Sequence, residues 1–344
     1  DVNAIGVTTP RPFYHPIPMG VLAGRRLRRE WHTPMHEYHV NHGADMMDTG
    51  AWRRPKSYLE GSPFPQIALE YQAVRKGVGI IDVSTLGKIE IYGRDAQALL
   101  EHAYTCTFDR LDENMTRYIF MVDSSGTIVD DGVAGRLGDG HFYVTATSTH
   151  SQTVLRQLQL FSDQLKLRVA IVDRTFQLGA INIAGPRTRR VLEEMTDLEL
   201  DDDKFPYLGI HEGIVAGIPA RLMRVGFVGE LGYEIHCDAS SGAVLWDSLL
   251  AAGEAEGCIA FGVEAQRLLR LEKGHIIIGQ DTDGTTNPFE VGLGWGVRLK
   301  KPRFHGKHSL QVLKSKVGRR LVGFEILHPL DEDHAGQDPI RECH

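Results

Sequence analysis

Alternating hydrophobic and polar positions divide much of the chain into short strands separated by helical segments. The strands that the alternation predicts in the first half cover residues 88–92, 116–122, 127–137, 141–146 and 168–174. Helical spacing predicts helices over residues 33–43, 63–76, 93–104 and 149–161. From residue 88 onward, the order strand, helix, paired strands, helix, strand is typical of a ferredoxin-like split βαβ unit.

A second set of elements follows with the same alternation of strands and helices. Strand-like segments are predicted over 176–184 and within 211–236, and a helix begins after Gly185-Pro186. Further helices are predicted over 241–252, 263–273 and 308–314, and a last strand over 320–326. The fold class that these patterns predict is α+β in several layers.

Composition narrows the class of protein. The 344 residues carry a net charge of −7 and are 42% hydrophobic, as in an ordinary globular protein with no nucleic-acid partner. The four cysteines are far apart in sequence, and no segment has the pattern of a signal peptide or a membrane helix. We therefore expect a soluble protein of a reducing compartment: the cytoplasm, or the mitochondrial matrix if the source is eukaryotic.

The first 30 residues form a proline-rich lead-in, and the predicted helix after it carries His36, His39 and His42. No acidic or cysteine partner converges with these histidines in sequence, so surface histidines are favoured over a metal site. The sequence therefore predicts no bound metal. Because the chain begins with Asp1 and ends at His344 without a recognisable element, we expect it to be part of a longer polypeptide.

Asp130 and Asp131 are neighbours in the predicted strand 127–137, so their side chains point to opposite faces of the sheet. Asp131 shares its face with apolar side chains, those of Val129, Val133 and Leu137. Desolvation would raise its pKa above the usual value of ~3.9 and make it a better proton acceptor than a solvated carboxylate. A structural role, in which the pair caps a loop or pairs with Arg136, fits the strand pattern equally well.

Three glycines at three-residue intervals, Gly226, Gly229 and Gly232, lie between two strand-like segments. The spacing is not the GxGxxG of a dinucleotide site, and no helix follows. Glu230 lies in this bend, where an ionised carboxylate can accept hydrogen bonds from a donor-rich heterocycle. Taken alone, the segment is more simply interpreted as a hairpin turn.

Together these segments resemble the aminomethyltransferase family, which includes the glycine cleavage system T-protein. The segments that carry the resemblance are 73–75, 79–84, 126–131, 184–186, 226–234, 270–272, 279–281 and 287–293. The likeness is greatest to the folate-binding region of the sarcosine oxidase alpha subunit. The segments that carry that likeness are 33–36, 84–90, 272–274 and 279–285.

The resemblance implies a three-lobed cloverleaf of ferredoxin-like and Greek-key β units around a central folate hole, with the third lobe incomplete. Residues 31–84 and 175–285 would form the first, discontinuous lobe. Residues 86–174 would form the second lobe, which carries the catalytic aspartate, and 286–344 a connector and the start of the truncated C-terminal lobe.

The resemblance also implies roles for individual residues. By this resemblance, Asp131 corresponds to the family's catalytic aspartate, and Glu230 corresponds to the carboxylate that binds the pterin of tetrahydrofolate. The other positions assigned to folate binding are Leu86, Tyr118, Val133, Phe227 and Tyr233. Leu86 replaces the methionine usual in T-proteins, and Gln266 stands where they carry an arginine. Both departures argue against a T-protein that handles a lipoyl-bound aminomethyl group.

The function implied is tetrahydrofolate-dependent one-carbon transfer as part of a sarcosine oxidase complex. A flavin-containing partner would oxidise the N-methyl group of sarcosine to an iminium, which tetrahydrofolate captures as 5,10-methylenetetrahydrofolate. Flavin and NAD would belong to other domains or subunits. Two alternatives stay open: a stand-alone aminomethyltransferase or folate-dependent demethylase, and a non-catalytic folate-binding or assembly domain.

Overall fold

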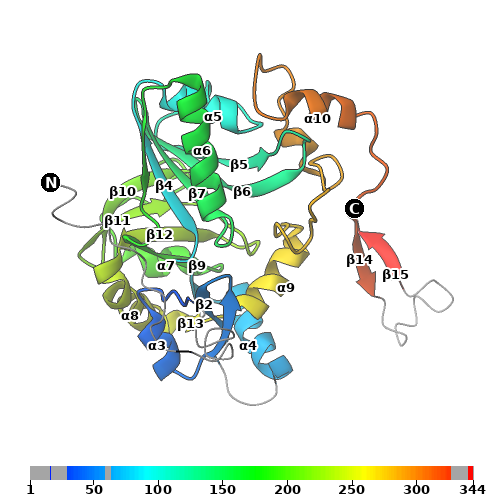
Figure 1. Ribbon diagram of the computed structural model, residues 1–344. Coiled ribbons are helices and arrows are strands. Elements are labelled where there is room, and N and C mark those ends of the chain that lie inside the picture. Colours follow the sequence, from blue (N-terminus) through cyan, green and yellow to red (C-terminus); the bar gives the residue numbers. More distant parts are fainter. Residues whose placement is uncertain (1–15, 17–28, 59–62, 327–339, 344) are drawn as a thin grey trace.

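The computed structural model describes residues 16, 29–58, 63–326 and 340–343. Two β-sheets with helices packed against them make up most of the structure (Figure 1), in keeping with the predicted α+β class. The three-lobed cloverleaf and its division into domains stay predictions for this chain. The proline-rich lead-in predicted over residues 1–30 lies almost entirely outside the described residues.

A five-stranded antiparallel sheet carries the predicted meander, in the order β5-β6-β7-β4-β8. Its strands are β4 (Gly87–Tyr92), β5 (Met115–Val122), β6 (Ile128–Gly138), β7 (His141–Ala146) and β8 (Ala170–Asp173). Helices α5 (Ala96–Ala103) and α6 (Ser151–Leu165) cover one face. Their apolar residues, such as Leu99 and Leu158, are fully buried against Ile91 and Val144 of the sheet.

The second sheet has six strands in the order β10-β11-β12-β9-β3-β13. Its strands are β3 (Gly79–Asp82), β9 (Leu178–Ala184), β10 (Ile210–Val215), β11 (Ile218–Met223), β12 (Gly232–Asp238) and β13 (Ile259–Ala260). One face packs on α3 (His36–Asn41), α7 (Thr188–Glu193) and α8 (Gly242–Gly253). The other face packs on α4 (Pro63–Lys76) and α9 (Val263–Lys273). Two 3-10 turns, η2 (Ala239–Ser241) and η3 (Glu254–Glu256), flank α8.

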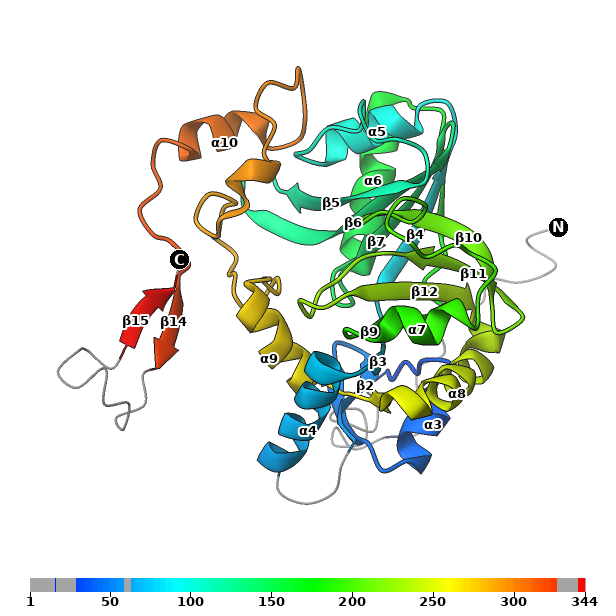
Figure 2. The same cartoon turned by 180° about the vertical axis from the view of Figure 1, so that it is seen from behind.

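The two sheets lie next to each other (Figure 2) and contact each other through a small apolar cluster. Tyr143 of β7 is buried there against Ile210, Met223 and Val225, which belong to the six-stranded sheet or follow it. Val133 of β6 packs against the same cluster. The face of β6 that bears Val133 is therefore turned toward the second sheet, away from α5 and α6.

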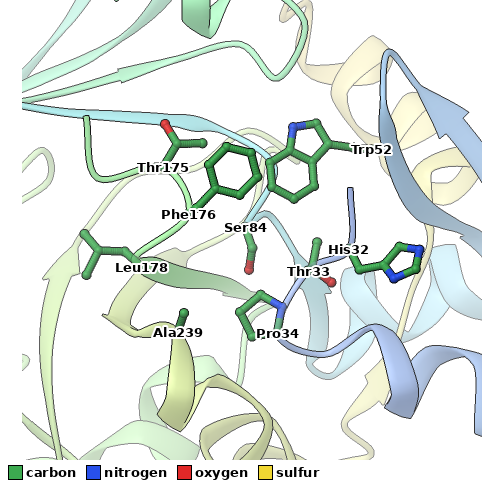
Figure 3. Close-up of a pocket in the computed structure, with 9 residues that line it drawn as sticks. All are labelled: His32, Thr33, Pro34, Trp52, Ser84, Thr175, Phe176, Leu178 and Ala239. Atoms are coloured by element: carbon green, nitrogen blue, oxygen red, sulfur yellow. The ribbon is translucent and has the colours of Figure 1, made fainter. Parts of the chain in front are cut away.

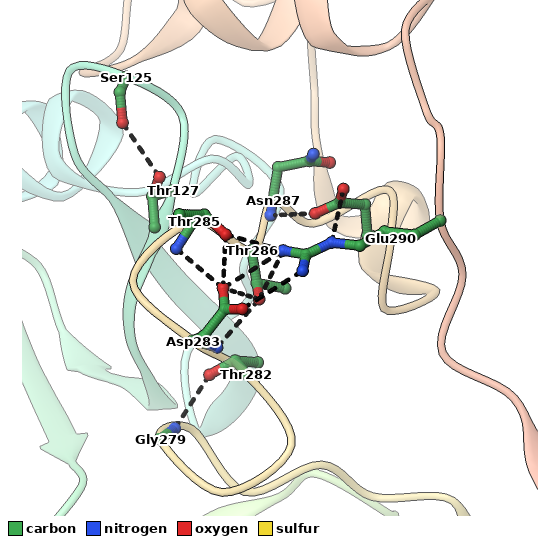
Figure 4. A network of polar contacts seen from close by, with 10 residues as sticks. Ser125, Thr127, Gly279, Thr282, Asp283, Thr285, Thr286, Asn287 and Glu290 are labelled. Atoms are coloured by element: carbon green, nitrogen blue, oxygen red, sulfur yellow. Dashed lines mark hydrogen bonds and ion pairs between the residues drawn. The ribbon is translucent and has the colours of Figure 1, made fainter.

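The segment after α9 returns to the five-stranded sheet and contains η4 (Leu293–Gly296) and α10 (Lys307–Leu313). Its apolar side chains bury Phe120 of β5. A polar network fixes the start of this connector (Figure 4): Asp283 accepts hydrogen bonds from Thr285 and Arg319. A hairpin of β14 (Gly323–Ile326) and β15 (Ile340–Cys343) follows.

Some elements of the structure were not predicted from the sequence pattern. The hairpin of β1 (Asp45–Thr49) and β2 (Trp52–Ser57) was not predicted, nor were β3 and β13. All four residues of β3 are buried, so the strand shows no alternation of polar and apolar positions. The expectation of surface histidines on α3 is wrong for His39, which is fully buried with Nε2 2.9 Å from Asp82 Oδ2.

Candidate functional site

Strand β6 turns two adjacent carboxylates to opposite sides of the five-stranded sheet. Asp130 is paired with Met121 of β5, whose side chain lies in the core beneath α5 and α6. Asp131 is paired with Phe120, whose side chain lies under the connector. Directly opposed residues share a face, so Asp130 points to the helical layer and Asp131 to the opposite side, as the period of two predicts.

The surroundings of Asp130 indicate a structural role for this side chain. Its side chain is 2% exposed and accepts hydrogen bonds from the backbone nitrogen of Thr147, at 3.1 Å, and from the Thr147 hydroxyl. Burial raises its pKa to about 7, and the nearby Asp131 charge adds to the rise. The loop-capping interpretation therefore applies to Asp130. The predicted alternative of an ion pair with Arg136 is not formed, since that guanidinium donates to the carbonyl of Leu111.

The two faces of this strand differ in burial. Asp131 shares its face with Val129, Val133 and Leu137, as expected, but the other face, with Ile128 and Ala134, is the more deeply buried. The reason is that α5 and α6 cover that face completely, whereas the Asp131 face meets the second sheet and the connector only in part.

Asp131 is half-buried and has one specific partner. The hydroxyl of Tyr118 donates to Oδ2 at 2.7 Å, and Oδ1 has no hydrogen-bond partner among the described residues. Burial raises the pKa of Asp131 to about 6, although the hydrogen bond from Tyr118 opposes the rise. The same burial, with the Asp131 charge, raises the pKa of Tyr118 well above its ordinary value. The predicted rise in the pKa of Asp131 is confirmed, and at neutral pH the group is an ionised, poorly hydrated proton acceptor.

Aromatic and apolar side chains surround this carboxylate. Val133 is opposite Tyr118 across the β5–β6 ladder, so both share the face of Asp131. Trp295 of the connector has its ring 5.9 Å from that of Tyr118 and is 61% exposed. A groove of about 1490 Å³ opens beside Tyr118 and Trp295. Trp295 was not predicted as a site residue, because only the fold brings the connector to β5.

Glu230 lies in the loop between β11 and β12 and is held by a single cation. Arg75 of α4 donates to Glu230 Oε1 at 2.9 Å and to Glu272 Oε2 at 2.7 Å. Glu230 Oε2 has no partner among the described residues, so it can accept a further hydrogen bond. The hairpin interpretation of this segment holds as far as topology is concerned, since β11 and β12 pair antiparallel.

The remaining predicted residues are dispersed. Phe227 is in the Glu230 loop and stacks on His275, with ring centroids 5.6 Å apart. Leu86 packs against the apolar cluster beneath α4 and α9. Tyr233 is 0% exposed in the core on the opposite face of the six-stranded sheet, where its ring meets Phe205. The structure thus joins Tyr118, Asp131 and Val133 on one face and places Tyr233 away from them.

A buried lysine supports the segment that carries Leu86. The Lys88 ammonium is fully buried and donates to the carbonyls of Ser84, Leu86 and Thr175, at 2.7, 3.0 and 3.3 Å. Burial lowers its pKa to about 8. Neither Lys88 nor Arg75 was singled out in the sequence, because a cation that binds distant carbonyls or carboxylates has no local pattern.

A second, smaller cavity lies apart from these carboxylates. It measures about 210 Å³ and lies between the start of the described chain and the six-stranded sheet, with Trp52 and Phe176 as aromatic walls (Figure 3). Among the described residues, no three His, Cys, Asp or Glu side chains converge as metal ligands. In the same part of the chain, no helix has the length and apolar character to cross a membrane.

Comparison with known proteins identifies the family. The model of the GCVT N-terminal domain matches residues 35–301. The chain belongs to this family. It is 38% identical to the sarcosine oxidase subunit alpha of Corynebacterium sp. (strain U-96) over 315 residues, which is 89% of this chain and 32% of that protein. It is 33% identical to an aminomethyltransferase of Thermotoga neapolitana over 295 residues, which are 86% of this chain and 78% of that protein.

The fold agrees with a solved member of the family. The aminomethyltransferase T of the glycine cleavage system from Bartonella henselae superposes with a TM-score of 0.76 at 24% identity, covering 86% of this chain and 78% of that one. The resemblance derived from the sequence motifs is confirmed. The chain spans about a third of the length of the sarcosine oxidase alpha subunits that it matches.

Proposed function

We propose that this chain binds tetrahydrofolate and that a one-carbon unit is transferred to the folate beside Asp131. The observation that carries the proposal is a half-buried carboxylate, held by Tyr118, with a pKa raised to about 6 and one oxygen free. Membership in a family with aminomethyltransferases supports the choice of reaction.

Asp131 supplies the acid–base chemistry in this proposal. Above pH ~6 its free Oδ1 accepts a proton from the reacting amine and stabilises positive charge that develops on nitrogen. Tyr118 fixes the carboxylate through Oδ2, so that Oδ1 keeps a constant orientation. Val133 provides an apolar wall, which limits the access of water to a hydrolysable one-carbon unit.

The residues around Glu230 fit a pterin ring. A pterin presents several N–H donors on one edge, and Glu230 Oε2 is a free acceptor in the same loop as the half-buried ring of Phe227. Arg75 holds the other oxygen through an ion pair of 2.9 Å. In this arrangement Glu230 and Phe227 orient the heterocycle, and Asp131 acts on the nitrogen that receives the carbon.

The one-carbon donor that we propose is a small N-methyl amine such as sarcosine, oxidised by a flavin-containing partner. Similarity to sarcosine oxidase alpha subunits over 89% of the chain supports this donor. Leu86 and Gln266, which depart from the T-protein pattern, support it further. The similarity to aminomethyltransferases supports a second candidate, a stand-alone aminomethyltransferase. Only the second candidate turns over without flavin-containing subunits, so an assay of the isolated protein separates them.

Equilibrium binding of tetrahydrofolate tests the proposal, with a matched pair of variants. Glu230→Gln and Glu272→Gln each remove one carboxylate from Arg75, but only Glu230 belongs to the proposed pterin site. We expect Glu230→Gln to weaken binding about tenfold or more, as for the loss of one charge-assisted hydrogen bond, and Glu272→Gln to leave it unchanged. Equal effects of the two variants, or no binding to the unmodified protein, would refute the site.

Asp131→Asn separates catalysis from simple binding. In the proposed mechanism this variant still binds tetrahydrofolate but transfers the carbon unit about 10² to 10⁴ times more slowly. A protein that binds folate and never transfers carbon, with or without this substitution, would instead be the non-catalytic folate-binding domain.

A further inference from the structure

The loop that carries Glu230 contains two glycines, so it needs contacts from outside to keep one conformation. Gly226 and Gly229 lie on either side of Phe227 and Val228, and Gly229 has a φ of +87°. Glycine loses more conformational freedom on folding than any other residue. The position of each side chain in this loop therefore depends on the parts of the fold that contact it.

Two residues of the loop are held by the core and by one cation. The Val228 side chain is 1% exposed in the apolar cluster beneath α4 and α9. Arg75 donates to the carbonyl of Val228 at 2.7 Å and to Glu230 Oε1 at 2.9 Å. Neither contact holds the side chain of Phe227, which helps to orient the heterocycle in the proposed function.

Phe227 is held by a different residue, His275, which lies just beyond the C-terminal end of α9. The Nδ1 of His275 lies 2.8 Å from the Phe227 carbonyl oxygen. Because a carbonyl oxygen can only accept, Nδ1 carries the proton and donates. The imidazole also stacks on the Phe227 ring, with centroids 5.6 Å apart and 24° between the planes. One side chain thus contacts both the backbone and the ring of Phe227.

The end of α9 places His275 for this contact. Gly274 takes the left-handed conformation, with a φ of +79°, and the backbone nitrogen of His275 donates to the carbonyl of Arg270 at 3.0 Å. Helices commonly end on a glycine in this way. The chain therefore leaves the helix in a defined direction, and its next residue contacts the Glu230 loop.

A buried ion pair fixes the backbone on the other side of His275. Arg270, whose side chain is 4% exposed, donates to the carboxylate of Asp281 and, at 3.0 Å, to the carbonyl of His275. Asp281 also accepts from the backbone nitrogen of Ile277 at 2.7 Å. Both backbone polar groups of His275 are thus bonded to Arg270, which gives the imidazole a constant position from which to support its neighbour.

We propose that His275 is a positioning residue of the pterin site, which holds Phe227 in the orientation that the heterocycle requires. The inference rests on the proposed function and adds to it a residue that acts through Phe227. Such a support lowers the cost of binding, because the aromatic ring is already ordered in the free protein. Loss of His275 should therefore weaken the binding of tetrahydrofolate.

The test compares equilibrium binding of tetrahydrofolate to the full protein and to two variants at this position. His275→Leu removes the donor and the ring, whereas His275→Asn keeps an amide N–H close to the position of Nδ1. The matched control is His211→Leu, because the His211 ring packs on Phe205, with centroids 4.6 Å apart, in the core on the opposite face of the six-stranded sheet. Unfolding curves of each variant establish that folded proteins are compared.

A lost hydrogen bond and a lost stacking contact each weaken an interaction by about twofold to about tenfold. We expect His275→Leu to bind about tenfold more weakly than the unmodified protein, His275→Asn to stay within about threefold, and His211→Leu to be unchanged. A double-mutant cycle with Phe227→Ala tests whether the effect passes through the aromatic ring. In the Phe227→Ala background, His275→Leu should weaken binding by no more than about twofold.

Unchanged binding in His275→Leu overturns the inference, and so do equal losses in His275→Leu and His275→Asn. A full tenfold loss in the Phe227→Ala background also overturns it, because His275 would then act on the loop as a whole and not through the ring. These three outcomes leave the proposed function standing. Failure of the unmodified protein to bind tetrahydrofolate refutes both.

Discussion

The hydrogen bond from Tyr118 to Asp131 should be visible in the pH dependence of the reaction. Burial raises the pKa of Asp131 to about 6, and this hydrogen bond, 2.7 Å long, opposes the rise. Tyr118→Phe removes the donor and with it the largest factor that opposes burial, so the pKa of Asp131 should rise further. A hydrogen bond to a charged group contributes about 1.5–3 kcal/mol, which corresponds to about one to two pKa units. Because Asp131 is only half-buried and water can replace part of the bond, we expect a rise of about one unit.

The assay is kcat/KM for one-carbon transfer between about pH 5 and about pH 9. Asp131 must be ionised to accept a proton, so activity should increase with pH through about 6 in the unmodified protein. In Tyr118→Phe this acidic limb should move to about pH 7. Tyr92→Phe is the matched control, because the Tyr92 hydroxyl donates to Glu90 on the same sheet. An acidic limb that stays in place in Tyr118→Phe would show that Asp131 is not the group that titrates.

Three further substitutions test the packing and electrostatics of the site. The folded state raises the pKa of Asp131 from 3.8 to about 6, so this group's contribution to stability is greatest below pH 3.8 and is lost as pH rises through about 6. Asp131→Asn should therefore stabilise the protein at alkaline pH by about 1–2 kcal/mol in chemical denaturation, and a lower stability would contradict this. Gly132→Ala would place a Cβ 2.0 Å from the carbonyl oxygen of Thr145, and unfolding curves should show a loss of about 3 kcal/mol or more. Lys301→Met would leave three carbonyls at the end of α5 without their donor, and limited proteolysis should then cleave the connector faster than in the unmodified protein.

Much of the secondary structure could be predicted because the apolar pattern is local. The predicted helix 63–76 has the same bounds as α4, and the predicted strand 116–122 differs from β5 by one residue. The prediction failed where tertiary burial removed the pattern, as in β3, or where no apolar alternation is present, as in the β1–β2 hairpin. A strand that is buried on both sides is distinguished from a loop or a helix only by its neighbours in space.

Part of the site could also be predicted, because the alternation of faces along a strand is a local pattern. The period of two correctly places Asp130 and Asp131 on opposite faces, but it does not show which face the helices cover. The sequence pattern could not predict contacts between distant segments. Arg75 and Glu230 are 155 positions apart, and Trp295 lies near Tyr118 only because the connector folds back onto β5. The pairing of Asp130 with the Thr147 loop likewise depends on how β6 and β7 are joined to α6.

The most direct test of the central claim is the fate of the one-carbon unit in the assembled protein. Sarcosine is oxidised in the presence of tetrahydrofolate, and the yields of 5,10-methylenetetrahydrofolate and free formaldehyde are measured for the unmodified protein, Asp131→Asn and Asp130→Asn. The account predicts that Asp131→Asn oxidises sarcosine at the normal rate but releases the carbon as formaldehyde, whereas Asp130→Asn, once folded, still forms the methylene product. A normal yield of methylene product from Asp131→Asn would contradict it.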